Sequence, residues 1–285
     1  MANPLSDTAN KTALRGISIA QLSTISLAKL HQRDPAELAL LDSASSNTGF
    51  FYLDFRGDAQ GNSVLAHLPN VYTAVEKYFD QPNEAKAKDT RLDIKASQDL
   101  GWKMGRGGES FELSRDEVAL NGASISKMPR LFRDGGAKIS DFMAGCDEAC
   151  LTLLNSLSED FMLHHRVDQP SDTGLKFVLH PSLARLSEVG ESLHTDSGTL
   201  TLLFYHDWSL HAFLPDAGIW GFLPPPAEGC ALVNVANTLQ RLSGGKLHSP
   251  KHRVTQPFDG AQNRYFLSYF LRPENELLEK WGSAN

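Results

Sequence analysis

The sequence predicts a mainly β fold with flanking helices, in which a β sandwich or jelly roll packs against a helical N-terminal half. The second half of the chain contains short apolar or alternating segments with the two-residue period of strands. Turn-forming residues such as Pro224-Pro225-Pro226 and Gly244-Gly245 separate these segments. The first half instead shows longer stretches with helical periodicity. The predicted strands are LKFVL, TLTLLFY, SLHAFL, CALVNVA, HRVTQ and RYFLSYFL.

The 285 residues are enough for one large domain or for two smaller ones. We divide the chain into an N-terminal helical and strand region, residues 1–145, and a jelly-roll core, residues 146–285. The sequence shows no internal repeat and no low-complexity linker between the two. We therefore expect both regions to form one compact unit.

The N-terminal region begins with a capped helix. In Asp34-Pro35-Ala36-Glu37, the Asp can cap, the Pro suits the first helical position and the Glu can reach back towards the cap. The helix is expected to run to about Ala44 and to stop at Asn47-Thr48-Gly49. Residues 50–55, FFYLDF, are typical of a buried strand. A second helix is predicted over residues 64–79, which carry one apolar face.

The stretch from about residue 91 to 133 lacks a clear periodicity. Its residues 101–108, GWKMGRGG, are rich in glycine like a phosphate-binding loop. However, no Gly-Lys-Ser/Thr sequence ends this stretch and no predicted strand and helix flank it. We therefore expect a mobile surface loop here.

A third helix is predicted where an apolar stripe contains two of the three cysteines. Cys146 and Cys150 are four residues apart and lie on the same helical face as Phe142 and Leu153. Half of a zinc site is one interpretation, but no second pair of ligands is nearby, so core packing is favoured. The low cysteine count and an amino terminus without a signal-peptide pattern predict a cytoplasmic protein.

Charge and hydropathy limit the class of partner. The net charge is −7 and the isoelectric point is near 5.8, which disfavours a nucleic acid or an anionic membrane surface. No apolar run approaches the roughly 18 residues that a membrane span needs. We therefore expect a small-molecule partner, and the sequence indicates no obligate protein partner.

A candidate metal site begins in the segment HTDSGTLTLL. On a strand, His194 and Asp196 would face the same way at roughly 6 to 7 Å, so that both side chains can reach one ion. A third ligand is available in LSGGKLHSPKHRV, which contains His248 and His252. Pro250 prevents a helix that would bring these two together, and on a strand they lie about 13 Å apart. Only one of the two can therefore join the site.

Residues 175–273 resemble the isopenicillin N synthase-like branch of the Fe(II)/2-oxoglutarate-dependent dioxygenases. That family carries the patterns His-Thr-Asp-x-Gly-x-Leu-Thr-Leu-Leu and Ser-Asn-Gly-Lys-x-x-Ser-x-x-His-Arg-Val. The resemblance implies a double-stranded β-helix, which is a jelly roll, and makes His252 the third ligand. The matching residues are Asp196, Gly198, Leu200, Thr201, Leu202 and Leu203 in the first pattern, and Ser243, Gly245, Lys246, Ser249, His252, Arg253 and Val254 in the second.

The ligand set suits this chemistry. Two imidazoles and one carboxylate on one face of a ferrous ion leave three positions open for dioxygen and a second small molecule, whereas zinc prefers a nearly closed tetrahedron. The resemblance thus implies a non-haem Fe(II)- and 2-oxoglutarate-dependent oxidoreductase. It would hydroxylate, desaturate or cyclise a small organic molecule, such as a specialised metabolite. A non-catalytic binding module on the same fold is a further interpretation, against which the intact ligand set argues.

The cosubstrate end of the expected site departs from the family pattern. Relatives anchor the distal carboxylate of 2-oxoglutarate on an Arg-x-Ser pair and often on a tyrosine before a proline. Arg264 matches, but Phe266 stands in place of the serine and His180 in place of the tyrosine. A guanidinium fork suits a carboxylate, and His180 either donates a hydrogen bond there or packs in the core. A 2-oxoglutarate-independent oxidase of the isopenicillin N synthase type is therefore the alternative.

The expected substrate pocket lies beside the same strand. Phe266 and Phe270 share one face by two-residue periodicity, and Trp102 lies in the glycine-rich stretch. We expect these three side chains to line the pocket and to favour a substrate with an apolar or aromatic part.

Overall fold

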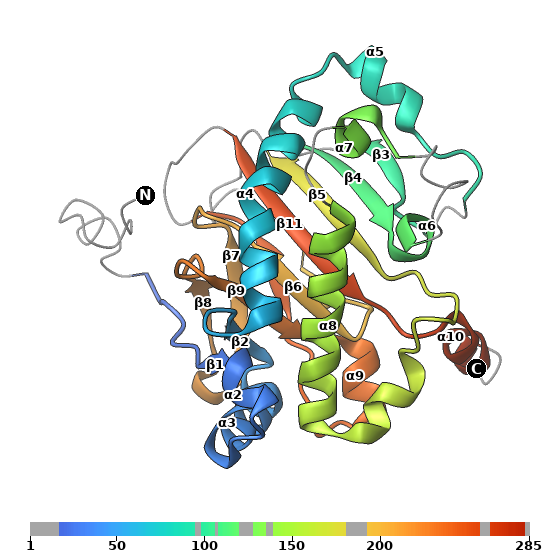
Figure 1. The fold of residues 1–285 in the computed structure, drawn as a ribbon. Helices are drawn as coiled ribbons and strands as arrows, with labels where there is room; N and C mark the ends of the chain where they lie inside the picture. The colour runs from blue at the N-terminus through green and yellow to red at the C-terminus, as the bar shows by residue number, and fades with distance from the viewer. Residues whose placement is uncertain are drawn as a thin grey trace.

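A computed structural model describes residues 17–94, 98–105, 108–119, 128–134, 139–180, 193–256 and 263–282. Its strands form two sheets (Figure 1). The larger sheet has the strand order β1 (Thr24–Ser26), β2 (Phe50–Asp54), β9 (Cys230–Val235), β6 (Leu200–Phe204), β11 (Arg264–Leu271), β5 (Gly174–His180), β4 (Glu109–Ser114), β3 (Gly101–Met104). The smaller sheet has the order β10 (His252–Val254), β7 (Leu210–Leu214), β8 (Ile219–Leu223).

The strands of the second half are connected as in a jelly roll. β9, β6, β11 and β5 are neighbours in the large sheet and pair antiparallel. β10, β7 and β8 form the small sheet, also antiparallel. Along the chain the strands pass back and forth between the two sheets, so each sheet collects strands that are distant in sequence. This topology places the inner faces of the two sheets against each other.

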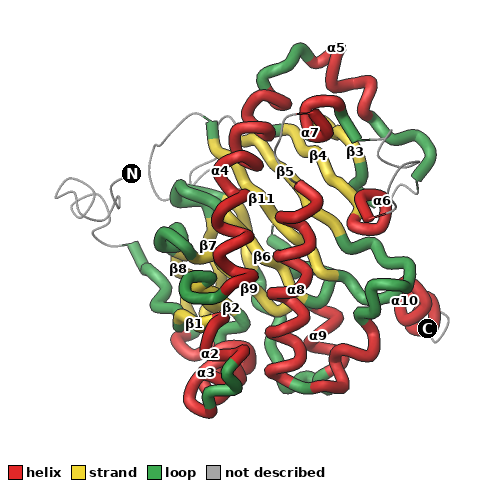
Figure 2. Tube along the Cα trace, viewed as in Figure 1, coloured by secondary structure: helices red, strands yellow, loops and turns green. Residues whose placement is uncertain are grey.

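Helices cover the other face of the large sheet. Figure 2 shows the two long helices α4 (Ala59–Phe79) and α8 (Ile139–Leu157) running over the strands. The shorter helices are α2 (Leu27–His31), α3 (Pro35–Asn47), α5 (Asn83–Lys86), α6 (Arg115–Ala119), α7 (Arg130–Asp134), α9 (Asn237–Leu242) and α10 (Asn275–Gly282), with 3-10 turns η2 (Ala87–Asp89), η4 (Glu159–His164) and η6 (Pro215–Ala217). None of the helices in the described ranges combines the length and apolar character that a bilayer crossing requires.

The large sheet therefore separates two apolar layers. On β11, Leu267 and Tyr269 belong to the layer under the helices, whereas Phe266 belongs to the layer between the sheets. Leu203 of β6 and Leu232 of β9 face the same inter-sheet layer. Alternation along each strand thus sends even-numbered residues of β11 inwards, towards the small sheet.

The first capped helix forms largely as the sequence predicts. The Asp34 carboxylate accepts a hydrogen bond from the backbone N–H of Glu37 at 2.9 Å, and Pro35 occupies the first helical turn of α3. Instead of returning to the cap, the Glu37 carboxylate accepts from the N–H of Ser26. α3 ends at Asn47, three residues beyond Ala44, and Gly49 follows with φ of 68°. A Cβ at Gly49 would lie 2.0 Å from the His248 carbonyl oxygen, so only glycine fits this turn.

Most of the other predicted elements are also present. FFYLDF forms β2, and the six segments of the second half form β5, β6, β7, β9, β10 and β11. The helix predicted over residues 64–79 lies within α4, which starts five residues earlier at Ala59. Cys146 and Cys150 are buried free thiols of α8 in the layer under the helices, which confirms core packing.

The prediction of a mainly β chain with a helical first half is confirmed only in part. The molecule mixes helices and sheet, and the first half contributes β1, β2, β3 and β4 to the large sheet. β1 has three residues and β3 has four, too few to show a period of two clearly in the sequence.

The glycine-rich stretch was wrongly predicted to be a mobile surface loop. Residues 101–104 form β3, which pairs antiparallel with β4, while residues 106 and 107 lie outside the described ranges. Trp102 is buried under the helices, and its indole N–H donates to Glu109 at 2.7 Å. Burial of this one aromatic ring anchors the strand despite the surrounding glycines.

We predict that Tyr269→Phe destabilises the fold by about 1–3 kcal/mol, because the Tyr269 hydroxyl donates a buried hydrogen bond to Asp147 at 2.6 Å. Burial raises the pKa of Asp147 and this bond opposes the rise. Losing the bond favours the protonated acid in the folded state only, so the deficit should grow as pH rises through the raised pKa of Asp147, above the ordinary Asp range. Urea unfolding at several pH values measures it. Tyr265→Phe in the same strand is the control, and equal losses in both variants would contradict the prediction.

Candidate metal centre

Two histidines that are 58 residues apart in the chain lie side by side at the edge of the small sheet. The backbone N–H of His194 donates to the carbonyl of His252 at 3.0 Å, and the N–H of His252 donates to the carbonyl of His194 at 2.9 Å. This reciprocal exchange is the hydrogen-bonded pair of an antiparallel ladder. The two imidazole centroids are therefore only 4.4 Å apart.

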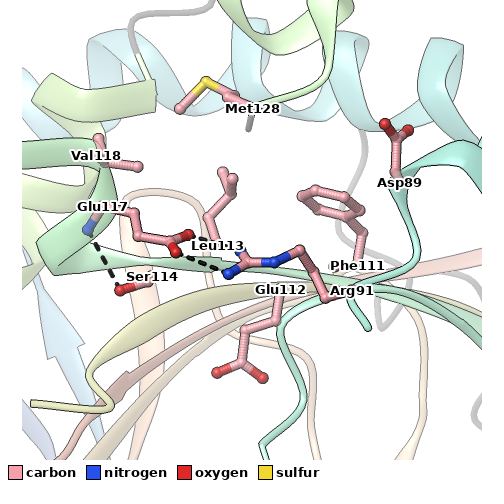
Figure 3. A pocket seen from close by; sticks show the side chains of 10 residues that line it. Asp89, Arg91, Phe111, Glu112, Leu113, Ser114, Glu117, Val118 and Met128 are labelled. Carbon is pink, nitrogen blue, oxygen red and sulfur yellow. Dashed lines mark hydrogen bonds and ion pairs between the residues drawn. The ribbon is translucent and has the colours of Figure 1, made fainter. Parts of the chain in front are cut away.

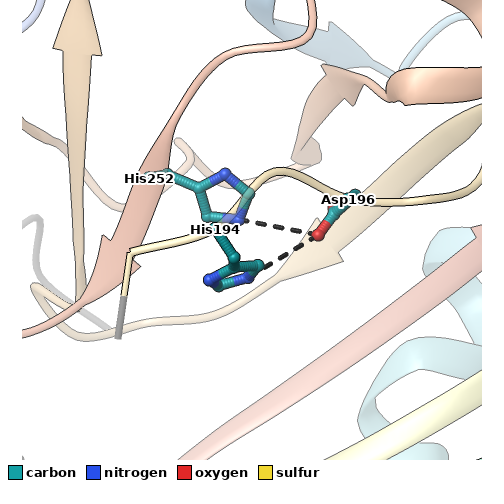
Figure 4. A group of neighbouring side chains, drawn as sticks. All are labelled: His194, Asp196 and His252. Carbon is teal, nitrogen blue, oxygen red and sulfur yellow. Dashed lines mark ion pairs between the residues drawn. The ribbon is translucent and has the colours of Figure 1, made fainter. Parts of the chain in front are cut away.

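Asp196 completes a three-residue cluster with these histidines (Figure 4). Its Oδ1 lies 3.7 Å from Nε2 of His194 and 3.7 Å from Nε2 of His252. One ligand atom from each residue falls within 4.8 Å of the others. The backbone carbonyl of Asp196 also accepts from the N–H of Asn237, the first residue of α9, which fixes the segment between His194 and β6.

His252 presents one particular nitrogen to the cluster. Its Nδ1 lies 3.2 Å from the Pro250 carbonyl, which can accept but cannot donate, so Nδ1 carries the proton. Nε2 is then the free acceptor facing Asp196 and His194. Burial lowers the pKa of His252, against the attraction of the Asp196 charge, and this favours the neutral imidazole that a metal ion requires.

The Asp196 carboxylate is held by two polar side chains of the large sheet. The Thr201 hydroxyl donates to Oδ2 at 2.7 Å, and the Asn234 amide donates to the same oxygen at 2.9 Å. Burial alone would raise the pKa of Asp196. Attraction to His252 when that imidazole is protonated, together with these two hydrogen bonds, outweighs burial, so the pKa of Asp196 lies below its usual value. Oδ1 is left facing the histidines.

Solvent reaches the cluster from one side. The side chain of His194 is 49% exposed, whereas those of Asp196 and His252 are 12% and 8% exposed. This donor set, two imidazoles and a carboxylate, suits a first-row divalent ion with ligands on one face and open positions on the other. The three side chains therefore fit a ferrous ion.

His248, the other histidine considered from the sequence, lies elsewhere. Its backbone N–H donates to the Ser45 carbonyl at 2.9 Å, and its carbonyl packs against Gly49. It is not among the residues whose ligand atoms converge.

Arg264 lies at the start of β11, on the inner face of the large sheet. Its side chain is buried, and its guanidinium donates to the Trp208 carbonyl at 2.7 Å and to the Gln256 side-chain oxygen. Burial lowers the pKa of Arg264 somewhat, and the nearby Asp207 opposes this, but the ordinary value is so high that the group stays charged. A buried, charged fork between the sheets is suited to a carboxylate ligand.

His180 and Phe266 are neighbours of Arg264 in the large sheet. His180 pairs directly with Arg264 across β5 and β11, and its ring meets the edge of Phe266 with centroids 5.8 Å apart. Phe266 is buried in the inter-sheet layer. Phe270 lies further along β11, opposite Thr201, and the Arg272 guanidinium stacks on its ring at 4.8 Å.

Trp102 does not belong with these residues, which corrects the prediction that it lines the substrate pocket. Trp102 pairs with Phe111 of β4, Phe111 pairs with Phe177 of β5, and Phe177 pairs with Leu267 of β11. All four side chains lie in the layer under the helices. Phe266 faces the small sheet instead. The β-sheet backbone thus separates Trp102 from the candidate metal centre.

A cavity opens at the β3–β4 end of the large sheet, away from the His and Asp cluster (Figure 3). Its walls include Arg91, Phe111 and Met128. The Arg91 guanidinium makes a two-bond ion pair with Glu117 across it, at 2.8 and 2.9 Å. Because the ion pair already neutralises the arginine, we do not assign this cavity to the chemistry of the site.

Asn234 and Gln256 were not singled out from the sequence, and Thr201 was named there only as part of the family pattern, without a role of its own. Asn234 is a polar residue in the otherwise apolar run CALVNVA, so a buried polar group in a central strand was the available signal. Thr201 on β6 and Gln256, two residues beyond the end of β10, have roles that depend on a register that the sequence alone does not fix.

Comparison with known proteins places this geometry in a family. The family model of the 2OG-Fe(II) oxygenase superfamily matches residues 160–273. A 2-oxoglutarate-dependent dioxygenase of Gibberella zeae is 32% identical over 276 residues, covering 90% of this chain and 81% of the relative. The 2-oxoglutarate-dependent dioxygenase frbH of Dothideomycetidae sp. is 31% identical over 277 residues, covering 91% and 84%.

Solved structures share the fold. A Neurospora crassa protein crystallised with alpha-KG and 5-formyluracil superposes with a TM-score of 0.69 at 21% identity, covering 92% of this chain and 87% of that one. The dioxygenase for auxin oxidation 1 from Arabidopsis thaliana, in its 2-oxoglutarate complex, gives 0.69 at 20% identity, covering 90% and 94%. The chain therefore belongs to the 2OG-Fe(II) oxygenase superfamily, an oxidoreductase family that uses Fe(II), 2-oxoglutarate and dioxygen.

Proposed function

We propose that His194, Asp196 and His252 hold the ferrous ion of a dioxygenase that oxidises a small organic, specialised-metabolite substrate. The observation that carries this proposal is the convergence of the three ligand atoms within 4.8 Å, on a support of backbone and side-chain hydrogen bonds. The names of the fungal relatives support 2-oxoglutarate use over the cosubstrate-independent alternative. Hydroxylation, desaturation and cyclisation are all compatible with this centre.

Dioxygen would be the oxidant: bound ferrous iron would activate it, one oxygen atom would pass into succinate as 2-oxoglutarate loses carbon dioxide, and the second would oxidise a substrate carbon. The side chains of the protein would position the metal ligands. Thr201 and Asn234 hold Oδ2 of Asp196 so that Oδ1 faces the metal position. The Pro250 carbonyl keeps the proton of His252 on Nδ1, which leaves Nε2 free to bind.

We assign the distal carboxylate of the cosubstrate to Arg264, with His180 directly across the sheet from it. Phe266 fills the position at which relatives carry a serine, and its ring contacts His180. The apolar side chains of Phe266 and Phe270 face inwards and are proposed to favour a substrate with an apolar or aromatic part. Exclusion of water by such side chains protects reactive chemistry.

We propose that residues 1–145 and 146–285 form a single compact unit. The large sheet, which takes β1 to β4 from the first region and β5, β6, β9 and β11 from the second, supports this proposal. A small-molecule substrate without an obligate protein partner, and a cytoplasmic location, stay predictions from the sequence.

We predict that His252→Ala lowers the affinity for Fe(II) by more than the roughly 100-fold that loss of a supporting residue can cause, because a direct ligand is removed. Anaerobic calorimetry with Fe(II) or Mn(II) measures this. His248→Ala is the matched control, since it removes a histidine four positions away that lies outside the cluster. Equal metal affinity in the His252→Ala variant and the wild type would contradict the assignment.

Removing the supports of Asp196 should weaken the metal site more mildly. Thr201→Val keeps the shape of the side chain but removes the hydroxyl that donates to Oδ2. We expect metal affinity to fall about 10-fold to 100-fold. Thr73→Val, an exposed site on α4, controls for the substitution itself. A Thr201→Val protein that binds metal as tightly as the wild type would show that the hydrogen bond does not orient the ligand.

The role of Arg264 can be tested by the release of labelled carbon dioxide from 2-oxoglutarate labelled at its first carbon. Arg264→Lys keeps the charge but loses the two-bond fork, so we expect the 2-oxoglutarate concentration for half-maximal release to rise about 10-fold or more. Arg56→Lys, which alters an exposed arginine, should leave it unchanged. Absence of release from the wild-type protein, with every candidate substrate tried, would count against 2-oxoglutarate use.

A further inference from the structure

The residues that link the metal centre to Arg264 lie on β10 of the small sheet and on the segment that follows it. Arg264 itself begins β11 of the large sheet. On β10 and its continuation, His252, Val254 and Gln256 alternate onto the inner side: His252 faces the cluster, Val254 packs in the inter-sheet layer and Gln256 contacts Arg264. The four-residue step from His252 to Gln256 corresponds to about 13 Å along the strand. The segment from His252 to Gln256 therefore supplies a metal-centre residue at one end and a partner of Arg264 at the other.

The donor and acceptor groups of the two side chains fix the orientation of the contact between Gln256 and Arg264. A guanidinium carries donors only, so the side-chain oxygen of the amide must face it. Gln256 is only 7% exposed and Arg264 only 3%, so water competes little for this bond. The Trp208 carbonyl accepts from the other terminal nitrogen at 2.7 Å. Two acceptors on different nitrogens fix the plane of the guanidinium.

The kind of acceptor also matters. The Gln256 amide and the Trp208 carbonyl are both neutral, so these two bonds orient Arg264 without cancelling its charge. A glutamate at position 256 would have nearly the same shape but would form an ion pair with the guanidinium. That ion pair would compete with any carboxylate that approaches the arginine.

We propose that Gln256 is a positioning residue for the cosubstrate, which holds the Arg264 fork with a neutral acceptor and so makes the site select 2-oxo acids that bear a second, distal carboxylate. The inference rests on the proposed function, because it takes Arg264 as the carboxylate anchor. It adds a residue on the opposite sheet to that anchor and states which ligand feature the residue controls.

Binding of two 2-oxo acids to the Mn(II)-loaded protein, measured by anaerobic calorimetry, tests this. 2-Oxoglutarate reaches both the metal and Arg264, whereas 2-oxopentanoate has the same chain length but lacks the distal carboxylate. In Gln256→Glu we expect 2-oxoglutarate to bind about 10-fold to 100-fold more weakly and 2-oxopentanoate to bind as in the wild type. Gln60→Glu, at an exposed position of α4, should change neither ligand.

A second variant separates positioning from charge competition. Gln256→Leu removes the acceptor without adding a charge, so 2-oxoglutarate should again lose affinity selectively, by about 10-fold. Urea unfolding of each variant identifies any loss of the fold. Gln256→Asn, which keeps a neutral amide on a shorter side chain, should recover part of the affinity lost in Gln256→Leu.

The outcomes distinguish the two proposals. Unchanged 2-oxoglutarate binding in a folded Gln256→Glu protein would overturn the role of Gln256 and leave the proposed function intact. Equal weakening of both 2-oxo acids would also overturn it, because it would indicate a general structural effect. A wild-type protein that binds Mn(II) but does not prefer 2-oxoglutarate to 2-oxopentanoate would overturn the carboxylate role of Arg264, and with it this inference.

Discussion

Two backbone hydrogen bonds between His194 and His252 join segments from the middle and the end of the chain, and the candidate metal centre depends on them. They bring two imidazoles to a centroid separation of 4.4 Å. Backbone groups in this ladder need no particular side chain, so the pairing can form before any metal is bound. Such preorganisation matters because a site that is already assembled does not spend metal-binding free energy on ordering the chain.

The large sheet divides the interior into two layers. Burial under α4 and α8 supplies most of the apolar contact, including Tyr269 and Leu267 of β11. The inner face is thereby free to carry polar groups such as Thr201, Asn234 and Arg264, which would be costly in the helix-covered core without partners. One face of these strands thus supplies most of the apolar burial, and the opposite face carries the polar groups of the candidate site.

The sequence was most informative where one segment determines its own structure. The capped start of α3, the turn at Gly49 and the alternating strands of the second half follow from local rules. The spacing of His194 and Asp196 indicated a metal site only together with the family resemblance, and the strand expected to carry both residues begins later, at Leu200. Trp102 was misplaced because a short strand among glycines carries little pattern, and Gln256 was missed because its contact with Arg264 depends on how two sheets face each other.

This arrangement gives a physical account of the two positions, 180 and 266, at which the sequence differs from the family pattern. Phe266 removes a hydroxyl beside Arg264 and contributes an apolar ring, and that ring packs against His180. The arginine is nevertheless held from the opposite side of the interior, by Gln256 on the continuation of β10. Because β10 also carries His252, a shift of this strand would move a metal-centre residue and the partner of the arginine together. The spacing between the candidate metal centre and the partner of Arg264 is therefore set by one continuous segment.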